Sequence, residues 1–198
     1  SSAGQANSDT LDGGAHSGGA GDTIQLSSGS HSFTNNSKIV NIETIIAHSS
    51  GSSVDLTNQT EGFTITGDAG VDTLKGGGGA DIITGNGGND IITGGAGNDS
   101  FTGSAGNDTF NVDAGSDTIT DLATGDDLVV TSGATATANN VSAFVADSDT
   151  TNAGTATINA ASGGSTITMT NSASGAYSLA GGAGVDIITG GTGNDIIT

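Results

Sequence analysis

A nine-residue pattern of polar and apolar positions organises the chain from Gly67 onward. Each repeat opens with a glycine-rich stretch, places aspartate at the sixth position and an apolar residue at the eighth. Seven repeats occupy residues 67–129 and two more occupy residues 181–198. The apolar eighth positions are Leu74, Ile83, Ile92, Phe101, Phe110, Ile119, Leu128, Ile188 and Ile197. Because each glycine-rich turn is followed by a few strand-forming Ile and Thr residues, the pattern predicts alternating turns and short strands.

Such short strands cannot bury their single apolar side chain in isolation. Stability must come from stacking successive strands about 4.8 Å apart, as in a solenoid. The sequence therefore predicts an all-β fold, a β-roll or β-helix solenoid built from two nonamers per turn.

The remaining segments are less regular, and they divide the chain into four predicted parts. Residues 1–66 are interpreted as irregular solenoid rungs, residues 67–130 as the regular roll, residues 131–180 as a Thr/Ala/Ser-rich β insert, and residues 181–198 as the start of a second repeat block. Strand-like pieces outside the nonamers are Ile39–Ile46, Val54–Thr57, Phe63–Thr66, Thr155–Ile158 and Thr166–Thr170, and Asp9–Leu11 and Asp22–Ile24 are interpreted as decayed repeats.

Composition adds a strong negative charge and restricts the possible partners. The 198 residues include 36 glycines, no cysteine, proline or tryptophan, and 21 acidic against two basic residues, for a net charge of −19. This composition is typical of disordered chains unless a stacked repeat or a cation compensates. With only Lys38 and Lys75 as basic residues, nucleic acid is not an expected partner. The longest apolar run, residues 45–47, is far too short for membrane insertion.

The aspartates are the candidate chemical groups. With two nonamers per turn, aspartates two repeats apart lie one above the other, which gives two columns of carboxylates. At about 5 Å and an effective dielectric of 20, each pair repels by roughly 3 kcal/mol. Several such pairs outweigh the typical net stability of about 5–15 kcal/mol. The predicted pairs are 72/90, 81/99, 90/108, 99/117 and 108/126.

A cation between the carboxylates removes this repulsion, and the available ligands select its type. Carboxylate and backbone carbonyl oxygens suit Ca²⁺, which accepts six to eight oxygens in flexible geometry. Mg²⁺ requires a tighter octahedron, and zinc or copper requires His or Cys. The sequence therefore predicts calcium as the cofactor.

The motif GGxGxDxUx, with U a large apolar residue, resembles the calcium-binding repeat of RTX proteins over residues 67–129 and 181–198. The resemblance implies a right-handed parallel β-roll whose turns bind calcium through the sixth-position aspartates and turn carbonyls of adjacent repeats on the same side. It also implies secretion by a bacterial type I system, with folding outside the cell. The implied side-chain ligands are Asp72, Asp81, Asp90, Asp99, Asp108, Asp117, Asp126, Asp186 and Asp195, and the implied carbonyl ligands are those of Gly76, Gly78, Gly85, Gly87, Gly94, Ala96, Gly97 and Gly106.

Three repeats depart from the motif. Asp68 replaces the second glycine of the first repeat, and Val112 and Asp113 replace both opening glycines of the sixth. The seventh repeat, residues 121–129, keeps little of the motif, so the resemblance supports the 108/126 pair less than the others.

Three functions are compatible with this pattern. The leading hypothesis is a calcium-binding structural or adhesive segment of a secreted bacterial surface protein, similar to the RTX segments of S-layer proteins and large adhesins. No nucleophile elbow, dinucleotide loop or P-loop pattern is present, so we do not expect an enzyme. The alternative is the non-catalytic C-terminal RTX module of a type I-secreted metalloprotease or lipase. A third possibility is ligand recognition by residues 131–180 through Phe144 and Tyr177.

Two further expectations concern the surface. His16, His31 and His48 stand in polar surroundings without metal-ligand spacing, so we expect them to be exposed to solvent. The last repeats leave Asp186 and Asp195 without partners two repeats further on, so we expect either continued repeats or head-to-tail self-association into a filament or lattice.

Overall fold

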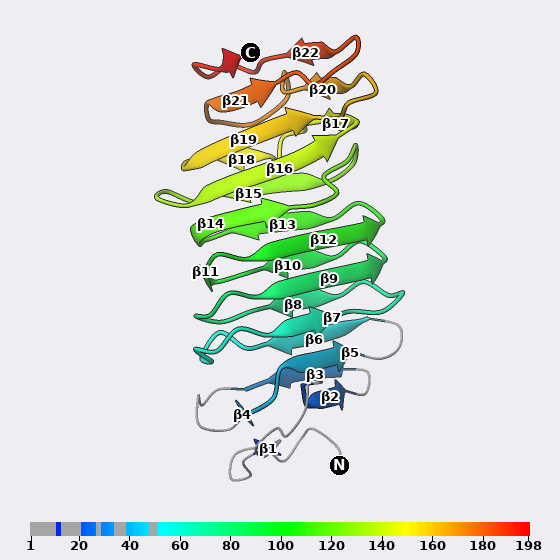
Figure 1. Cartoon of the computed structure of the whole chain (residues 1–198), viewed down its shortest axis with the longest axis vertical. Helices are drawn as coiled ribbons and strands as arrows, with labels where there is room; N and C mark the ends of the chain where they lie inside the picture. Colours follow the sequence, from blue (N-terminus) through cyan, green and yellow to red (C-terminus); the bar gives the residue numbers. More distant parts are fainter. Residues whose placement is uncertain (1–10, 13–20, 27–28, 34–38, 48–50) are drawn as a thin grey trace.

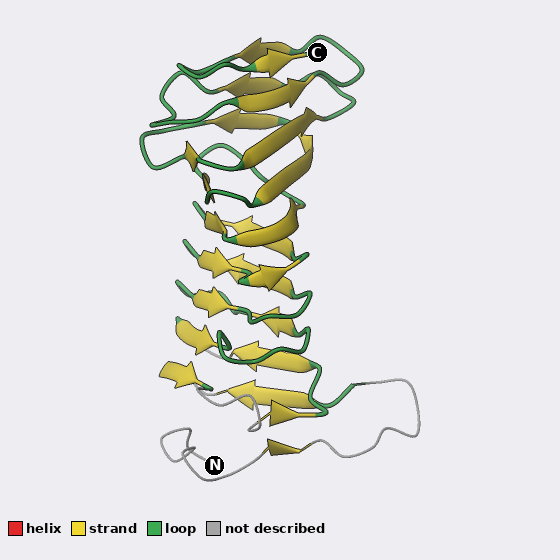
Figure 2. Cartoon of the chain, turned by 90° about the vertical axis from the view of Figure 1, so that its left-hand side faces the viewer, coloured by secondary structure: helices red, strands yellow, loops and turns green. Residues whose placement is uncertain are grey.

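The computed structural model describes residues 11–12, 21–26, 29–33, 39–47 and 51–198. Within these ranges every regular element is a β-strand, and no helix is present that could span a membrane. The strands stack along one long axis, from β2 and β3 near one end to β22 and β23 at the other (Figures 1 and 2). All strand pairs are parallel, so the chain is an all-β solenoid, as expected.

Two long sheets and two short ones make up the solenoid. The first long sheet runs in the order β2 (Thr23–Leu26), β5 (Thr44–Ala47), β7 (Thr64–Thr66), β9 (Ile82–Gly87), β12 (Ser100–Ala105), β14 (Ala114–Ile119), β16 (Thr135–Val141), β19 (Thr155–Ala160), β21 (Tyr177–Ala180) and β23 (Ile196–Ile197), with β11 (Ala96–Gly97) paired to β14. The second long sheet runs in the order β18 (Thr151–Asn152), β15 (Asp127–Val130), β13 (Thr109–Val112), β10 (Ile91–Thr93), β8 (Thr73–Lys75), β6 (Ser52–Asp55) and β3 (Gly29–Ser32). The short sheets contain β17 (Ala143–Val145), β20 (Thr166–Thr168) and β22 (Ile187–Thr189), and β1 (Leu11–Asp12) with β4 (Ile39–Val40).

The register confirms two nonamers per turn in the regular region. Ile91 of β10 pairs with Thr73 of β8, two repeats earlier, and Ser100 of β12 pairs with Ile82 of β9 at the same offset. Successive nonamers therefore alternate between the two long sheets, and each sheet gains one strand per turn.

The apolar eighth positions form the core between the sheets. From the first to the seventh repeat all seven are fully buried, at 0% exposure: Leu74, Ile83, Ile92, Phe101, Phe110, Ile119 and Leu128. Phe101 of β12 and Phe110 of β13 stack in parallel across the core, with ring centroids 6.4 Å apart. The last repeats differ, because Ile188 is only partly buried and Ile197 is 53% exposed.

Residues 131–180 continue the stack rather than interrupt it. Thr135 pairs with Ser116 in the regular region, and Thr155 pairs in turn with Thr135, so β16 and β19 lie in the same sheet as the nonamer strands. The rung from Thr135 to Thr155 and the rung from Ala156 to Tyr177 are both longer than two nonamers, and they differ in length. These longer rungs contain no nonamer, yet they add strands to the same core. The four predicted domain boundaries stay a prediction.

The N-terminal strand-like pieces also form rungs. The predicted strands near Val54 and Phe63 appear as β6 and β7, the piece beginning at Ile39 divides into β4 and β5, and the decayed repeat at Asp22 leads into β2. The expectation of an exposed His31 is wrong: its side chain is only 5% exposed, because it faces inward from β3 opposite Val54. His16, His48 and the start of the piece at Asp9 lie outside the described residues.

Candidate metal centre

The sixth-position aspartates stack in two columns at the edges of the solenoid. Each aspartate comes directly before a short strand, except Asp117, which lies within β14, so the strand register fixes its height. Its Oδ1 accepts a hydrogen bond from the backbone N–H of the aspartate one turn earlier. The distances from N to Oδ1 are 2.8 Å for Asp72 to Asp90, 2.8 Å for Asp81 to Asp99, 2.9 Å for Asp90 to Asp108, 3.0 Å for Asp99 to Asp117 and 2.9 Å for Asp108 to Asp126. All five pairs predicted from the spacing are therefore brought together.

The columns extend into the less regular rungs at both ends. Asp72 accepts a hydrogen bond from the N–H of Ser52, and Asp81 accepts one from the N–H of Phe63 at 2.7 Å. In the second repeat block, Asp186 accepts one from Ser165 at 2.9 Å and Asp195 one from Tyr177 at 2.9 Å. The hydrogen-bonding pattern thus persists where the sequence motif is absent.

Burial separates the first seven aspartates from the last two. The carboxylates of the first block are 0–5% exposed, whereas Asp186 and Asp195 are half-buried. A buried carboxylate is stable only when it is paired, hydrogen-bonded or coordinated to a metal. The structure offers few side-chain cations for this purpose, because the chain carries only two basic residues.

The glycine at the first position of the repeat makes room for the carboxylate. A β-carbon on Gly85 would overlap Oδ2 of Asp90 and would lie 2.9 Å from the carbonyl oxygen of Gly103. The same holds for the first-position glycines at 67, 76, 94 and 103, where Oδ2 of the aspartate in the same repeat occupies the place of a β-carbon. The role of this glycine is thus steric: the carboxylate folds back over a residue without a side chain.

Turn carbonyls lie beside several of these carboxylates. A β-carbon on Gly67 would overlap both the carbonyl oxygen of Gly85 and Oδ2 of Asp72. A β-carbon on Gly76 would likewise overlap the carbonyl oxygen of Gly94 and Oδ2 of Asp81. Gly85 and Gly94 therefore place a carbonyl oxygen beside a column carboxylate, and calcium binding by these two carbonyls stays a prediction. The predictions for Gly76, Gly78, Gly87, Ala96, Gly97 and Gly106 stay predictions.

Three carboxylate oxygens are buried without any partner in the described part of the chain. They are Oδ2 of Asp90, Asp99 and Asp117. An unpartnered carboxylate oxygen that is shielded from water costs several kcal/mol relative to one that is satisfied. The donor set around it consists of carboxylate and carbonyl oxygens, which is the set that calcium accepts. The residues present therefore fit a calcium ion.

The pKa values of the column aspartates reflect the same burial. Removal from water raises the pKa of Asp81, Asp90, Asp117 and Asp126 to about 6, and it raises the pKa of Asp99 and Asp108 above the usual range. Neighbouring carboxylates add to the pKa of Asp90, whereas the hydrogen bond from the N–H of Asp72 lowers it. Without a cation, the folded columns thus disfavour the ionised form.

The degraded seventh repeat still takes part in its column. Asp126 receives its hydrogen bond from the N–H of Asp108, as in the intact repeats. Asp121, which replaces the opening glycine, accepts hydrogen bonds from the N–H groups of Gly103 at 3.0 Å and Ser104 at 2.7 Å. The missing glycine is thus replaced by a carboxylate that binds the turn of the fifth repeat.

Sequence reasoning missed one further group of carboxylates. Asp127 of β15 and Asp147 and Asp149, which follow β17, place oxygens within 4.8 Å of one another. Burial and the neighbouring Asp147 raise the pKa of Asp127 to about 6. Asp147 and Asp149 lie outside the nonamers, and only their alternate spacing could have drawn attention to them.

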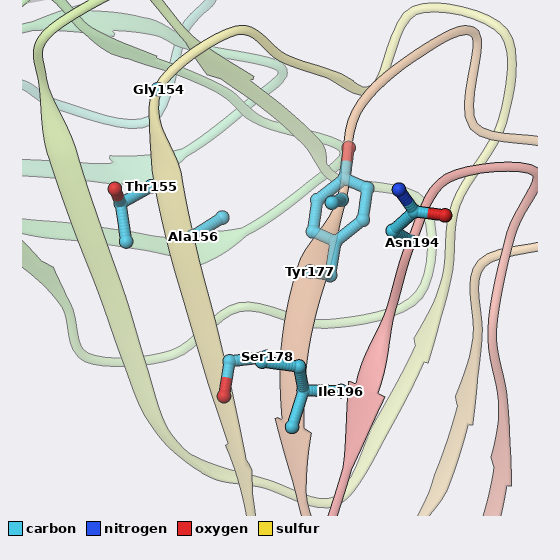
Figure 3. A pocket seen from close by; sticks show the side chains of 8 residues that line it. Gly154, Thr155, Ala156, Tyr177, Ser178, Asn194 and Ile196 are labelled. Carbon is cyan, nitrogen blue, oxygen red and sulfur yellow. The ribbon is translucent and has the colours of Figure 1, made fainter.

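The aromatic residues of the 131–180 segment do not form a binding surface. Phe144 and Tyr177 are both fully buried. Beside Tyr177 lies a shallow hollow of about 200 Å³ that Thr155, Asn194 and Ile196 also line (Figure 3). The Tyr177 hydroxyl donates to the carbonyl of Ser174 at 3.3 Å, and burial raises its pKa to about 12. Both rings belong to the core and offer no exposed face to a ligand.

Comparison with known families supports the interpretation of the columns. The family model of the RTX calcium-binding nonapeptide repeat matches residues 64–92, 84–119 and 178–198. Searches of the curated proteins and of the solved structures gave no match. The matched segments include the columns from Asp72 to Asp117 and the two aspartates of the second block. Residues 64–119 and 178–198 are therefore RTX calcium-binding nonapeptide repeats, carried on a parallel β-solenoid.

Proposed function

We propose that this chain is a calcium-dependent structural and adhesive segment of a bacterial cell-surface protein, similar to RTX segments of S-layer proteins and adhesins. RTX repeats are calcium-binding and typify secreted proteins. The observation that carries the proposal is the pair of buried carboxylate columns, three of whose oxygens have no partner among the described residues. Without a cation the carboxylates within each column repel one another. A bound cation would instead link the turns to which these carboxylates belong.

In this proposal the sixth-position aspartates supply the side-chain ligands. Each Oδ1 is fixed by the N–H of the preceding turn, as for Asp90 on Asp72, and this fixes the height of the carboxylate. Where the first position is glycine, Oδ2 lies over that residue, beside carbonyls such as that of Gly103. A bound calcium ion neutralises the stacked charges and joins consecutive turns.

Calcium controls where this segment folds. A chain of net charge −19 with few apolar residues stays expanded when its carboxylates are ionised and unpaired. Millimolar extracellular calcium supplies the missing counter-charge, whereas the low calcium of a cytosol does not. The segment therefore passes through a secretion system unfolded and becomes rigid outside the cell.

Self-association is the second part of the proposal. The last rungs expose eighth-position side chains whose counterparts in the first seven repeats are fully buried: Ile197 is 53% exposed and Ile188 is only partly buried. A second copy stacked on these rungs covers them and continues the columns beyond Asp186 and Asp195, an arrangement that need not close into a ring. Light scattering in calcium and in chelator tests it: growth in calcium supports the stacking, and a monomer at high protein concentration excludes it.

Surface location is tested on cells that produce the protein. Antibody against residues 51–198 should label intact cells in millimolar calcium, and an EGTA wash should release the labelled protein into the supernatant. Protein that is found only in the medium, together with a copurifying protease or lipase activity on the same polypeptide, would instead identify the segment as a module of a secreted enzyme.

A further inference from the structure

The turns of the repeats fall into two conformations. In one, Oδ2 of the sixth-position aspartate accepts a hydrogen bond from an N–H three or four residues earlier in its own turn. We call these closed turns. They occur at Asp72 with the N–H of Asp68 at 2.9 Å, at Asp81 with Gly77 at 2.9 Å, at Asp126 with Ala123 at 2.8 Å, and at Asp195 with Gly191 at 2.7 Å.

The third to sixth repeats have a different turn, which we call open. Their fourth-position glycine has a positive φ, namely 118° at Gly88, 142° at Gly97, 144° at Gly106 and 99° at Gly115. The fourth residues of the closed turns, at 70, 79, 124 and 193, do not have a positive φ. The conformation of one residue thus separates the two groups of turns.

Three of the four open turns leave an oxygen of their aspartate without a partner. Oδ2 of Asp90, Asp99 and Asp117 is buried and accepts no hydrogen bond in the part of the chain that the structure describes, and the three side chains are 1–2% exposed. In the fifth repeat the N–H of Ser104 donates to Asp121 instead of to Asp108. The eighth repeat also has a positive φ, 112° at Gly184, but Asp186 is half-buried and is accessible to water.

A closed turn and a cation compete for the same oxygen. The N–H in a closed turn supplies the partner that a buried carboxylate needs, so a cation gains less by binding there. In an open turn no N–H competes, and the dehydrated oxygen gains its first partner when a cation binds. Calcium affinity therefore depends on the conformation of the turn as well as on the aspartate.

We propose that calcium binds at the open turns of the third to sixth repeats, residues 85–117, and that the closed turns are held by hydrogen bonds in its place. This rests on the proposed function, in which the aspartate columns hold calcium. The open turns are consecutive along the chain and alternate between columns. One open pair, Asp90 and Asp108, lies in one column, and Asp99 and Asp117 lie in the other. Calcium thus clamps both edges of the solenoid along the same central stretch.

Two matched substitutions test the proposal, Asp99→Asn in an open turn and Asp81→Asn in a closed one. The two aspartates belong to one column, are equally buried and each accept an N–H from the preceding turn. Asparagine keeps that acceptor and replaces Oδ2 by an NH₂ group. Native mass spectrometry of the whole chain in calcium counts the bound ions, and calcium titration followed by circular dichroism gives the midpoint.

We expect Asp99→Asn to bind fewer ions than the wild type and to raise the calcium midpoint at least about tenfold, because it removes ligand charge. We expect Asp81→Asn to bind as many ions as the wild type. Its melting temperature should fall, because the new NH₂ group faces the N–H of Gly77. An equal loss of ions from both variants overturns the proposal while leaving the proposed function intact, and a wild type that binds no calcium defeats the proposed function itself.

A second pair covers the case in which one variant fails to fold. Asp117→Asn lies in an open turn and Asp126→Asn in a closed one. Loss of ions, or of folding in calcium, that is confined to the open-turn variants of both pairs supports the proposal. Loss that is as great in Asp126→Asn as in Asp117→Asn contradicts it.

Discussion

At the scale of single residues, the repeat fixes the position of one carboxylate oxygen. In the repeats that keep both, aspartate at the sixth position and glycine at the first fit together, because the carboxylate of Asp90 occupies the space of a side chain on Gly85. Spacing alone predicted the stacking of the aspartates, since it follows from the two-nonamer turn. It did not predict the relation to the first glycine, which depends on how the carboxylate folds back within its own turn.

Substitution of this glycine tests the relation. Gly85→Ala should lower calcium affinity and destabilise the calcium-bound chain by about 2 kcal/mol or more, because the new methyl group overlaps Oδ2 of Asp90. Gly163→Ala is the matched control, since a β-carbon there meets no atom within 4 Å. Urea unfolding in calcium measures both variants. Equal stability of the two would contradict the steric role of Gly85.

The raised pKa values predict how the calcium-free chain responds to pH. The pKa of Asp81 is about 6 in the folded chain against an ordinary value of 3.8, so the folded form holds extra protons between these values. This contribution to stability is complete below about pH 4 and is lost as the pH rises through 6. The β-sheet content of the calcium-free chain, measured by circular dichroism, should therefore fall as the pH rises from 4.5 to 7.5.

Saturating calcium should reverse this trend, because the metal binds the ionised carboxylates and must displace their protons at low pH. Calcium should be removed by dialysis over a chelating resin, since EGTA binds it weakly in acid. A calcium-free chain whose β-sheet content rises from pH 4.5 to 7.5 would show that the column aspartates are not held protonated by burial.

At the scale of the elements, each strand contributes one buried side chain to a shared row. The seven fully buried eighth positions could be predicted because they recur at a fixed interval, six of them beside a strand-forming Thr. Residues 131–180 could not be placed in the same way, because their rungs are longer than two nonamers and use small side chains such as Ala136 and Ala138. Rungs of unequal length have no sequence period, although they hydrogen-bond to the same sheet.

Removal of one core ring tests the importance of the stacked row. Phe110→Ala should destabilise the calcium-bound chain by about 3–5 kcal/mol, since it deletes a fully buried ring that stacks on Phe101. Thr109→Ala, at the neighbouring half-buried position of β13, should change stability by less than about 1 kcal/mol. Urea unfolding in saturating calcium gives both values. Similar losses of unfolding free energy in the two variants would show that the buried ring is not a main source of the stability of the rung.

At the scale of the whole molecule, the parallel topology increases the electrostatic repulsion within an acidic chain. Parallel stacking brings like charges into register once per turn on each edge, in a chain of net charge −19. The sequence predicted this conflict and its solution by calcium. It could not predict which turns are open, because Gly79 and Gly97 are the same residue at the same position and only the second has a positive φ.

The central claim is that calcium makes this solenoid fold, and circular dichroism of the calcium-free chain tests it most directly. The chain is dialysed at length against EGTA at pH 7.5 and titrated with calcium, with magnesium as the control. The account predicts a disordered spectrum without calcium, a cooperative change to a β-sheet spectrum as calcium is added, and little change with magnesium. A full β-sheet spectrum in the calcium-free chain that calcium leaves unchanged would contradict it.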